Sequence, residues 1–510
     1  MVAFRAKARV GVWHLKYHFP QEAPVPRLRS LVIESLETLA LLALTCGTSG
    51  AQKEPNPAAT PLLVGQIIES APCAADPAQS YALYLPSGYS PAKAWPIIYV
   101  FDPGARGKVP VRLYKDAVEK YGYIIAASNN ARNFQSDVVT KAAKAMWDDT
   151  HVRLSLDQRR IYMMGFSGGA RVATELAVVC EQCAIAGVIA HGAGYPFPPS
   201  DKERFAYFAF IGDKDFNWPE VMELRRKKEE CCAPYQLRLF RGEHQWAPPE
   251  IFGEAIAWLQ LVAMQRGIVP PDSVFIDQQF GRIQEEAEDA LHSKDAMGQF
   301  EAYRSLALDF SGLKDVTSYQ AKLAALKASP ELKQARKKEQ EAIDQQRAIT
   351  QELSSDLSRV GEADLDQQQT LRGAILDSMA GLEKKAERAK NDEARLISLR
   401  AFNELWVQGI EAGQAALQNH KQLAKAELYF QLMSAATPDE PWPALLLAET
   451  AAARGDKKRA CKDLREAVRR GLKNSDAIEL DPNLQSLRNE PDFQQIVAEL
   501  KAKREAQPEQ

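Results

Sequence analysis

A serine between glycines is the residue of this chain best placed to do chemistry. Ser167 lies at the centre of the pentapeptide Gly-Phe-Ser-Gly-Gly, which follows an apolar run at 161–164 and precedes a helical pattern at 171–179. At a strand-to-helix turn of this kind the hydroxyl is held exposed, and small neighbours let strand and helix approach closely. A hydroxyl becomes a good nucleophile only when a base removes its proton. We therefore predict that Ser167 is a nucleophile that needs a histidine nearby.

Such a histidine and an acid follow Ser167 in the chain. Asp215 comes after the strand pattern at 205–211, and His244 comes after the strand pattern at 237–240. Parallel strands end at one edge of their sheet, so side chains just beyond the strand ends can meet there. Imidazole can take the proton of a serine hydroxyl, and a carboxylate fixes the tautomer of that imidazole. Ser167, Asp215 and His244 are therefore the predicted catalytic triad, in that chain order.

The acid and the base of this triad have alternatives. Asp213 also follows the strand pattern and is the alternative acid, although a carboxylate at that place could instead cap a helix. Among the other histidines, His191 follows a strand pattern but precedes the acid, and His151 precedes the nucleophile. His244 matches the chain order of a triad best.

The oxygen that becomes negatively charged when a carbonyl is attacked needs two backbone N–H donors. Gly168, directly after the nucleophile, is the first predicted donor. The second is expected in the loop at 102–107, which follows another strand pattern. Pro103 in that loop has no N–H, so Gly104 is the predicted donor and Ala105 the alternative. The other interpretation of this loop is an ordinary Pro-Gly turn.

Side chains near the same sheet edge could line a substrate pocket. Arg132 follows a further strand pattern, within an Asn-rich segment at 129–133, and could hold a substrate carboxylate. The alternative for this segment is loop capping by its asparagines. Trp246 and Trp218 flank two of the triad residues, and we expect them either to form an aromatic wall or to belong to the core.

Nothing in the sequence indicates a metal site or another cofactor. Cys180 and Cys183 form a Cys-x-x-Cys pair, but no second pair follows at the spacing of a zinc site. Cys231 and Cys232 are adjacent and have no accompanying histidine pair. We expect the protein to work without a cofactor, and we expect one or two disulfides among these residues and Cys73 if the chain is exported.

Residues 63–265 resemble the α/β-hydrolase superfamily. The sequence Tyr-Ala-Leu-Tyr-Leu-Pro-Ser-Gly-Tyr at 81–89 and the sequence Trp-Pro-Ile-Ile-Tyr-Val-Phe at 95–101 are similar to the opening strands of its compact serine esterases. These esterases group with dienelactone hydrolases, feruloyl esterases and polyhydroxybutyrate depolymerases. Asp-Phe-Asn at 215–217 and His-Gln-Trp at 244–246 resemble bacterial members that carry helical-repeat tails.

The resemblance implies hydrolysis of a carboxylic ester through an acyl-serine intermediate, with the family's triad at Ser167, Asp215 and His244. The family's usual spacing after the strand favours Asp215 over Asp213. Many relatives carry His-Gly where this chain has Asp-Pro at 102–103, which leaves the second oxyanion donor open. The alternatives are a serine peptidase of the prolyl-oligopeptidase-like type and a non-catalytic scaffold whose helical tail binds a protein partner.

Apolar runs that alternate with helical patterns predict an α/β core with a mostly parallel sheet, and the later sequence, rich in Ala, Leu, Lys, Glu and Gln, predicts an all-α region. We therefore divide the 510 residues into a leader-like segment at 1–51, an α/β-hydrolase domain at 52–266, a charged helical region at 267–410 and tetratricopeptide-like helical repeats at 411–510. Within the charged region, we expect a long solvated helical hairpin at 329–395.

The repeat prediction rests on an offset of 34 residues near the end of the chain. Residues of matching type recur at this offset: Ala426, Phe430 and Met433 in the first unit, and Ala460, Leu464 and Ala467 in the second. Tetratricopeptide helices pack small residues against large ones at such positions. Pro438 closes the first unit, but Leu472 stands at the matching place in the second, and Gly455 lies at the turn. The alternative is an unrelated helical bundle, because at least three repeats are normally needed for stability.

The first part of the chain contains an apolar run at 39–46, too short to span a bilayer but long enough for the core of a signal peptide. Small residues follow at 47–51, as signal peptidase prefers, although Glu34 and Glu37 precede the run where a signal peptide has positive charge. Cys46 also resembles a lipoprotein site. We expect an exported protein, either periplasmic, secreted or lipid-anchored; the alternative is a short buried helix in a cytoplasmic protein.

Composition and charge restrict the expected partners. The net charge is −3 and the hydrophobic content is 45%, as in an ordinary soluble globular protein. No basic patch interleaved with aromatic residues is present, so we expect no nucleic-acid partner. The expected partners are a small-molecule or polymeric ester and, through the helical tail, a protein.

Overall fold

The computed structural model describes residues 62–133, 136–200, 203–230, 234–473, 475–479 and 481–506. The predicted leader at 1–51, with Cys46, lies outside these residues, and so do Cys231 and Cys232. Across the described part of the chain, no helix combines the length and the apolar character that a bilayer span requires.

One eight-stranded sheet, in the order β1-β2-β4-β3-β5-β6-β7-β8, forms the first half of the described chain. Its strands are β1 (Ile67–Pro72), β2 (Ser80–Tyr84), β3 (Trp95–Phe101), β4 (Ile124–Ser128), β5 (Leu156–Phe166), β6 (Gly187–His191), β7 (Ala206–Gly212) and β8 (Tyr235–Phe240). β2 runs antiparallel to β1 and β4, and all the other neighbours pair in parallel. The predicted α/β class with a mostly parallel sheet is confirmed.

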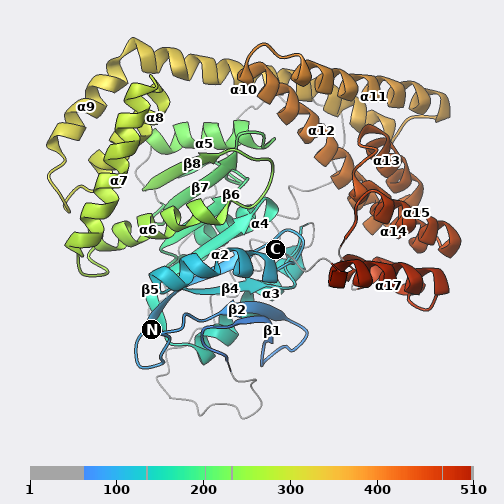
Figure 1. The fold of residues 1–510 in the computed structure, drawn as a ribbon, viewed down its shortest axis with the longest axis horizontal. Coiled ribbons are helices and arrows are strands. Elements are labelled where there is room, and N and C mark those ends of the chain that lie inside the picture. The colour runs from blue at the N-terminus through green and yellow to red at the C-terminus, as the bar shows by residue number, and fades with distance from the viewer. Residues whose placement is uncertain are drawn as a thin grey trace, which may run out of the picture.

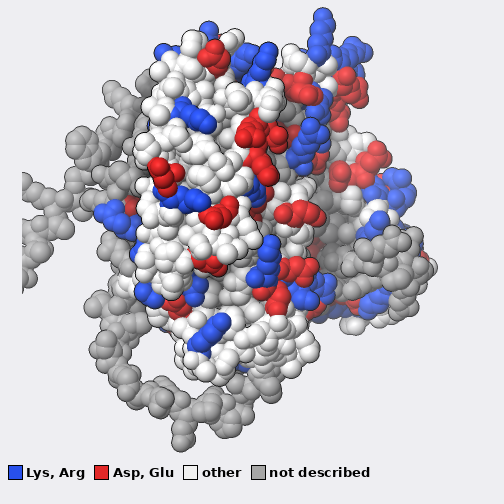
Figure 2. All heavy atoms as spheres, turned by 60° about the vertical axis from the view of Figure 1, so that its left-hand side comes forward, with Lys and Arg blue, Asp and Glu red and all other residues white. Residues whose placement is uncertain are grey.

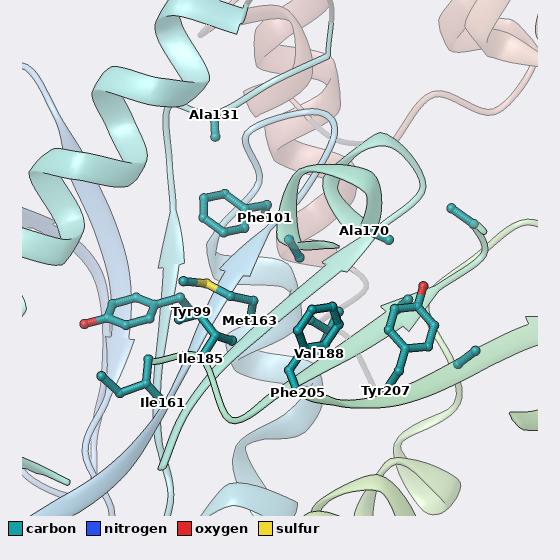
Figure 3. Close-up of a cluster of buried hydrophobic side chains, with 14 of the residues drawn as sticks. Tyr99, Phe101, Ala131, Ile161, Met163, Ala170, Ile185, Val188, Phe205 and Tyr207 are labelled. Atoms are coloured by element: carbon teal, nitrogen blue, oxygen red, sulfur yellow. The ribbon is translucent and has the colours of Figure 1, made fainter. Parts of the chain in front are cut away.

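The central strands are apolar along their whole length because helices cover both faces of the sheet. Every residue of β3, β4, β6 and β7 is buried, as expected for parallel strands that have no solvent face. One face is covered by α3 (Ser136–Arg153), α4 (Gly168–Val179) and α5 (Trp218–Glu230), and the other by α2 (Lys108–Tyr121) and α6 (Pro249–Gln265). Figure 3 shows part of the core on the first face, with Tyr99, Met163 and Val188 among its buried side chains.

The rest of the described chain is helical. Its helices are α7 (Ser273–His292), α8 (Ala296–Leu308), α9 (Thr317–Ala328), α10 (Pro330–Val360), α11 (Leu365–Glu387), α12 (Asp392–Gln418), α13 (Leu423–Ala436), α14 (Pro441–Ala453), α15 (Lys457–Arg469), α16 (Asp476–Glu479) and α17 (Pro491–Ala506). In Figure 1 these helices curve around the sheet domain, from α7 and α8 on one side, past α10 and α11, to α13, α14 and α15 on the other.

α10 and α12 join the core of the sheet domain. Ala342 and Ile343 of α10 and Ile397 of α12 belong to the buried cluster on the face covered by α3, α4 and α5. The predicted hairpin at 329–395 is present as α10 and α11, and it differs from the expectation in one respect: Ala342 and Ile343 of α10 pack in a hydrophobic core and are not solvated. The predicted domain boundary between 410 and 411 is also wrong, because it falls inside the continuous helix α12.

The residues that suggested a repeat lie on α13 and α15. All six are fully buried: Ala426, Phe430, Met433, Ala460, Leu464 and Ala467. Gly455, with a φ of 80°, ends α14 in the left-handed conformation that glycine adopts without strain. After α15, the four-residue helix α16 stands where the second helix of a complete repeat unit is expected. The residues that recur at an offset of 34 are thus buried positions of two helices, α13 and α15. The assignment of these helices to tetratricopeptide repeats stays a prediction.

The cysteines in the described residues are either bonded or buried. Cys180 and Cys183, directly after α4, form a disulfide. Cys73 and Cys461 are free thiols, and both are buried. The Cys-x-x-Cys pair is therefore a disulfide in this structure.

Acidic and basic side chains are mixed on the face of the molecule seen in Figure 2, and no continuous basic area is visible on that face. This mixture agrees with the small net charge of −3. A polyanion such as nucleic acid needs a surface of one sign, and this face does not supply one.

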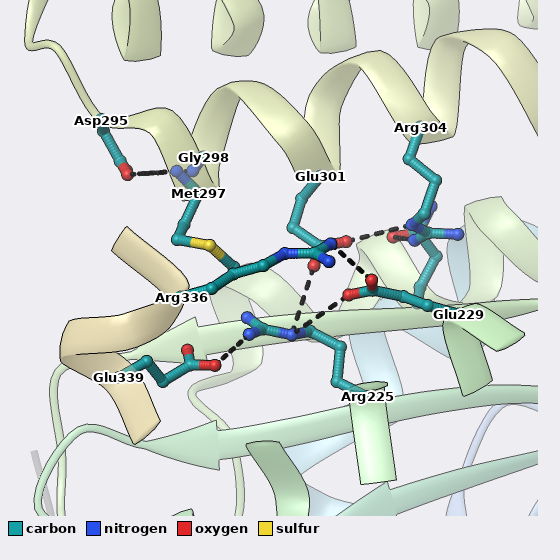
Figure 4. A network of polar contacts seen from close by, with 10 residues as sticks. Arg225, Glu229, Asp295, Met297, Gly298, Glu301, Arg304, Arg336 and Glu339 are labelled. Carbon is teal, nitrogen blue, oxygen red and sulfur yellow. Dashed lines mark hydrogen bonds and ion pairs between the residues drawn. The ribbon is translucent and has the colours of Figure 1, made fainter. Parts of the chain in front are cut away.

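A network of buried charges joins α5 to α8 and α10. Arg225 of α5 pairs with Glu339 of α10, and its Nε lies 3.6 Å from Oε1 of Glu301 on α8. Arg336 of α10 pairs with Glu229 of α5 at 2.5 Å. Figure 4 shows these side chains converging from the three helices. Such a cluster is sensitive to the loss of one charge, because the remaining charges stay buried without their partner.

We expect Arg225→Ala to lower the free energy of unfolding by about 3–5 kcal/mol, because Glu339 would keep a buried charge without the cation that it pairs with. Chemical denaturation of the full chain measures this change. Lys337→Ala is the matched control: Lys337 pairs with Glu341 along α10, but its side chain is 77% exposed. Exposed pairs of this kind contribute about 0–1 kcal/mol, so equal losses in the two variants would contradict the role of the buried network.

Candidate active site

Ser167 lies in a strained turn between β5 and α4. Its φ and ψ are 53° and −123°, a conformation that side chains other than glycine rarely adopt. A Cβ on Gly165 would lie 2.1 Å from the carbonyl oxygen of Gly169, and a Cβ on Gly169 would lie 2.0 Å from that of Phe101. The glycines are therefore required by the close approach of strand and helix, and the serine is held at the carboxyl end of β5.

Asp215 and His244 are brought together by the loops after β7 and β8. His244 Nδ1 lies 2.9 Å from Asp215 Oδ2 and 3.0 Å from Oδ1. The carboxylate is fully buried and also accepts a hydrogen bond of 2.9 Å from the backbone N–H of Asn217. Burial raises the pKa of Asp215, and the neighbouring His244 opposes that rise. With Nδ1–H donating to the carboxylate, His244 Nε2 is left to accept a proton.

The ring of His244 lies beside the turn that carries the serine. Its centroid is 4.6 Å from the ring of Phe166, the residue before Ser167, and 4.4 Å from the ring of Phe216. A Cβ on Gly192 would lie 3.2 Å from His244 Cε1 and 3.1 Å from Phe166. No side chain separates these rings, so the histidine and the serine turn share one edge of the sheet.

The serine itself is anchored through its backbone. The N–H of Ser167 donates a hydrogen bond of 2.8 Å to the carbonyl of His191, at the end of β6. The hydroxyl of Ser167 makes no hydrogen bond with any residue in the described part of the chain. In ligand-free enzymes the bond between nucleophile and base is often long and tightens when the substrate binds. Of the predicted triad, the structure joins the acid to the base and places the serine turn next to them.

Asp213, the alternative acid, makes hydrogen bonds that connect loops and does not bond His244. Its Oδ1 accepts a hydrogen bond of 3.0 Å from the N–H of Gly242, and its carbonyl accepts one of 2.6 Å from Arg400 Nε. These bonds tie the loop after β7 to the loop after β8 and to α12. Asp215, and not Asp213, is the carboxylate bonded to His244.

The loop after β3 does not offer the expected oxyanion donor. The N–H of Gly104 donates a hydrogen bond of 2.8 Å to Asp102 Oδ1, and the N–H of Ala105 donates one of 3.0 Å to the Asp102 carbonyl. The prediction for Gly104 is therefore wrong, because both N–H groups are occupied. The buried Asp102 carboxylate also accepts bonds from Arg106 at 2.8 Å and from Trp246 Nε1 at 3.2 Å. The Asp-Pro sequence builds a self-bonded turn, which was the alternative interpretation.

Gly168, the other predicted donor, begins α4, where the N–H groups of a helix have no partner within the helix. A Cβ on Gly168 would lie 2.0 Å from Asn133 Oδ1, so the amide of Asn133 packs directly on this residue. The backbone N–H of Asn133 donates to the carbonyl of Pro103 at 3.0 Å. The sequence pattern placed the segment 129–133 at this edge of the sheet, and Arg132 was chosen from it as the residue that could bind substrate. The packing of Asn133 on Gly168 could not be predicted, because no sequence pattern indicates such a contact.

The remaining pocket predictions have different outcomes. Trp246 is buried, its Nε1–H is bonded to Asp102, and its ring lies 4.8 Å from that of His191, which agrees with the core alternative. Trp218 is also buried in the core. Arg132 is exposed, and it is among the charges that oppose the burial-driven rise in the pKa of Asp481 in the helical region. Its contact with a substrate stays a prediction.

His191 is a structural histidine. It is fully buried, and its ring lies among four aromatic rings: Tyr114, Phe210, Trp246 and Phe252. Its Nδ1 accepts a hydrogen bond of 3.2 Å from the N–H of Ala247. Burial lowers the pKa of His191 to about 3, so the imidazole stays neutral.

Two other features lie apart from these residues. A cavity of about 720 Å³ between β8, α7 and α8 is lined by none of the predicted site residues. Among the residues that the structure describes, no group of three or more His, Cys, Asp or Glu side chains is arranged to hold a metal ion. The site built around His244 is therefore the candidate active site.

Neither a protein-family model nor a curated protein matches the sequence. Among solved structures, an S-formylglutathione hydrolase from Staphylococcus aureus is 13% identical, with a TM-score of 0.30, over 36% of this chain and 90% of that one. An acetyl ester-xyloside bifunctional hydrolase from Caldicellulosiruptor lactoaceticus is 16% identical, with a TM-score of 0.29, over 38% of this chain and 92% of that one.

An acylaminoacyl peptidase from Pyrococcus horikoshii is 9% identical, with a TM-score of 0.30, over 39% of this chain and 41% of that one. The solved structures that resemble this chain are thus esterases and related hydrolases. Likeness this weak carries no argument about chemistry, so the function has to be argued from the geometry of the site.

The two neighbouring aspartates give a matched test of the acid. Asp215→Asn should lower kcat for a reactive ester by about 10⁴-fold, because the amide cannot hold the imidazole in the tautomer that accepts a proton. Asp213→Asn keeps the Oδ1 atom that bonds Gly242, and we expect a change of less than about threefold. Initial rates with a p-nitrophenyl ester measure both variants, and a loss confined to the Asp213 variant would contradict the assignment.

The buried imidazole of His191 predicts a pH dependence of stability. Its folded-state pKa of about 3 is below its ordinary value of 6.5, so between these values the unfolded chain binds a proton that the folded chain does not. Stability from this group is therefore complete above about pH 6.5 and falls by about 1.4 kcal/mol per pH unit below it. We expect the free energy of unfolding to fall less between about pH 7.5 and about pH 5.5 in the His191→Gln variant than in the unaltered chain. Chemical denaturation at the two pH values measures this difference. Parallel losses in both proteins would show that His191 does not titrate as proposed.

Proposed function

We propose that this protein is a serine hydrolase that cleaves carboxylic esters through an acyl-serine intermediate. The observation that supports this proposal most directly is the hydrogen-bonded pair of His244 and the buried Asp215, at 2.9 Å, beside the strained turn of Ser167. A buried carboxylate on one imidazole nitrogen, with a serine at a strand-to-helix turn nearby, is the arrangement that acyl transfer requires.

The residues act in two half-reactions. In the first, His244 Nε2 takes the proton of the Ser167 hydroxyl as the oxygen attacks the ester carbonyl, and the imidazolium then protonates the departing alcohol. In the second, His244 takes a proton from water, which attacks the acyl-serine, and Ser167 recovers its proton as the acid leaves. Asp215 stabilises the imidazolium in both half-reactions and keeps its own charge.

The carbonyl oxygen becomes negatively charged in each attack and needs donors. The N–H of Gly168 is the proposed first donor, since it begins α4 directly after the nucleophile. The side-chain amide of Asn133, packed on Gly168, takes the place proposed earlier for Gly104. An Asn amide can serve as an oxyanion donor, as backbone N–H groups do.

We also propose that the protein works outside the reducing cytosol. The support is the disulfide between Cys180 and Cys183, because disulfides persist mainly in oxidising compartments.

The nucleophile is tested by Ser167→Ala. We expect this variant to lose labelling by a fluorophosphonate probe completely and to lose about 10⁶-fold in kcat with p-nitrophenyl esters, because no other hydroxyl is held at this turn. Ser273→Ala, at an exposed serine at the start of α7, is the matched control and should label normally. Persistent labelling of the Ser167 variant would refute the nucleophile. Faster turnover of aminoacyl amides than of esters by the unaltered chain would favour the peptidase alternative.

A further inference from the structure

α12 holds the start of the loop that supplies the proposed acid. Arg400 of α12 donates a hydrogen bond of 2.6 Å to the carbonyl of Asp213. Asn403, three residues later, donates one of 3.4 Å to the carbonyl of Lys214. The two residues that precede Asp215 are therefore fixed from the helical region.

Gln346 of α10 holds the other side of the same loop, directly after Asp215. Its Nε2 donates a hydrogen bond of 3.0 Å to the carbonyl of Phe216 and one of 3.2 Å to Oε2 of Glu404 on α12. A carbonyl and a carboxylate both accept hydrogen bonds, so the nitrogen of the amide, and not its oxygen, has to face them. The side chain of Gln346 is fully buried. Its amide is therefore held in one orientation.

The carbonyl that Gln346 holds belongs to the peptide group that also holds the acid. The carbonyl of Phe216 and the N–H of Asn217 are the two polar groups of one planar, trans peptide. That N–H donates a hydrogen bond of 2.9 Å to Oδ1 of Asp215. Because the peptide is planar, a bond that fixes its carbonyl also fixes the direction of its N–H.

A continuous chain of hydrogen bonds thus joins α10 to the proposed base. It runs from Gln346 through the peptide between Phe216 and Asn217 to Asp215, and Nδ1 of His244 lies 2.9 Å from the same carboxylate. A hydrogen bond to a peptide carbonyl makes the N–H of that peptide a stronger donor, because bonds in a chain polarise one another. The Asp215 side chain is fully buried, so its orientation depends on these donors and not on water.

Packing alone does not explain an amide at this position. Oε1 of Gln346 is buried and has no hydrogen-bond partner in the described part of the chain, and such an atom lowers stability. Ala342 and Ile343, on the same helix, fill the core with apolar side chains. The bond from Nε2 to the Phe216 carbonyl is the interaction that an apolar side chain at position 346 could not make.

We propose that Gln346 is a positioning residue for the acyl transfer: through the peptide between Phe216 and Asn217, it directs the carboxylate of Asp215 towards His244. This inference rests on the proposed function, because it uses the roles given there to the acid and the base. Gln346 acts through Asp215 and not on the substrate. The helical region is then a required part of the catalytic unit.

The test is a double-mutant cycle in the full chain between Gln346→Met and Asp215→Asn, with kcat and KM for a p-nitrophenyl ester as the readouts. Methionine has a similar length but cannot donate to the Phe216 carbonyl. We expect Gln346→Met to lower kcat by about 10- to 100-fold, as a small misplacement of a catalytic group does, and to leave KM unchanged. In the Asp215→Asn background the same substitution should cause little further loss, because the carboxylate that Gln346 positions is already absent.

Arg347→Met is the matched control. Arg347 is the next residue on α10, and it donates a hydrogen bond of 2.7 Å to Glu223 of α5. It therefore also joins the helical region to the sheet domain, but through α5 and not through the loop that carries Asp215. We expect its kcat to be unchanged.

Titration of Ser167 with a fluorophosphonate probe counts the assembled sites, so that kcat refers to folded protein only. Equal losses from Gln346→Met in the two backgrounds, or an unchanged kcat per labelled site, overturn this inference and leave the proposed function intact. If Gln346→Met does not fold, Gln346→Asn takes its place in the cycle, because its amide is one methylene too short to reach the Phe216 carbonyl. If neither variant folds, the role of Gln346 is structural and the inference is overturned. Failure of the unaltered chain to hydrolyse the ester or to label at Ser167 overturns both this inference and the proposed function.

Discussion

The burial of the Asp215 carboxylate is the constraint on which the candidate site depends. A charge with no solvent must be held by hydrogen bonds, and here the donors are His244 Nδ1 and the backbone N–H of Asn217. Those bonds fix the orientation of the imidazole, and the imidazole in turn lies against Phe166 at the serine turn. The buried Asp215 thus positions His244, the proposed base, beside the turn that carries Ser167, the proposed nucleophile.

The helical region serves the same constraint. Arg400, Asn403 and Gln346 take up the carbonyl oxygens of the loop around Asp215, groups that water would otherwise have to satisfy. Ala342, Ile343 and Ile397 extend the hydrophobic core of the sheet domain into α10 and α12. These contacts explain why the second half of the chain cannot be treated as a separate module: it shares a core with the first and shapes the acid loop.

The loop after β3 shows how one buried side chain decides which backbone N–H groups have partners. A buried aspartate at position 102 collects the N–H of Gly104, the guanidinium of Arg106 and the indole of Trp246. These hydrogen bonds stabilise the turn, and the N–H group of Gly104 already has a partner within it. The Asn133 amide, which packs on Gly168 from the loop after β4, is therefore the second oxyanion donor that we propose.

The sequence by itself determined the α/β class, the strand-to-helix turn at Ser167 and the pairing of His244 with an acid after β7, because each depends on local pattern and on the rule that parallel strands end at one edge. The sequence left Asp213 as an alternative to Asp215, because both follow the same strand. Only the direction of each side chain decides which carboxylate meets His244. The sequence also misjudged Gly104 and the boundary at 411, because hydrogen bonding and helix length depend on contacts that the local sequence pattern does not show. Only the tertiary structure brought Arg400 and Gln346 to the loop that carries Asp215, 187 and 130 residues along the chain from their partners Asp213 and Phe216, since that approach is decided by how α10 and α12 pack on the loop beyond β7.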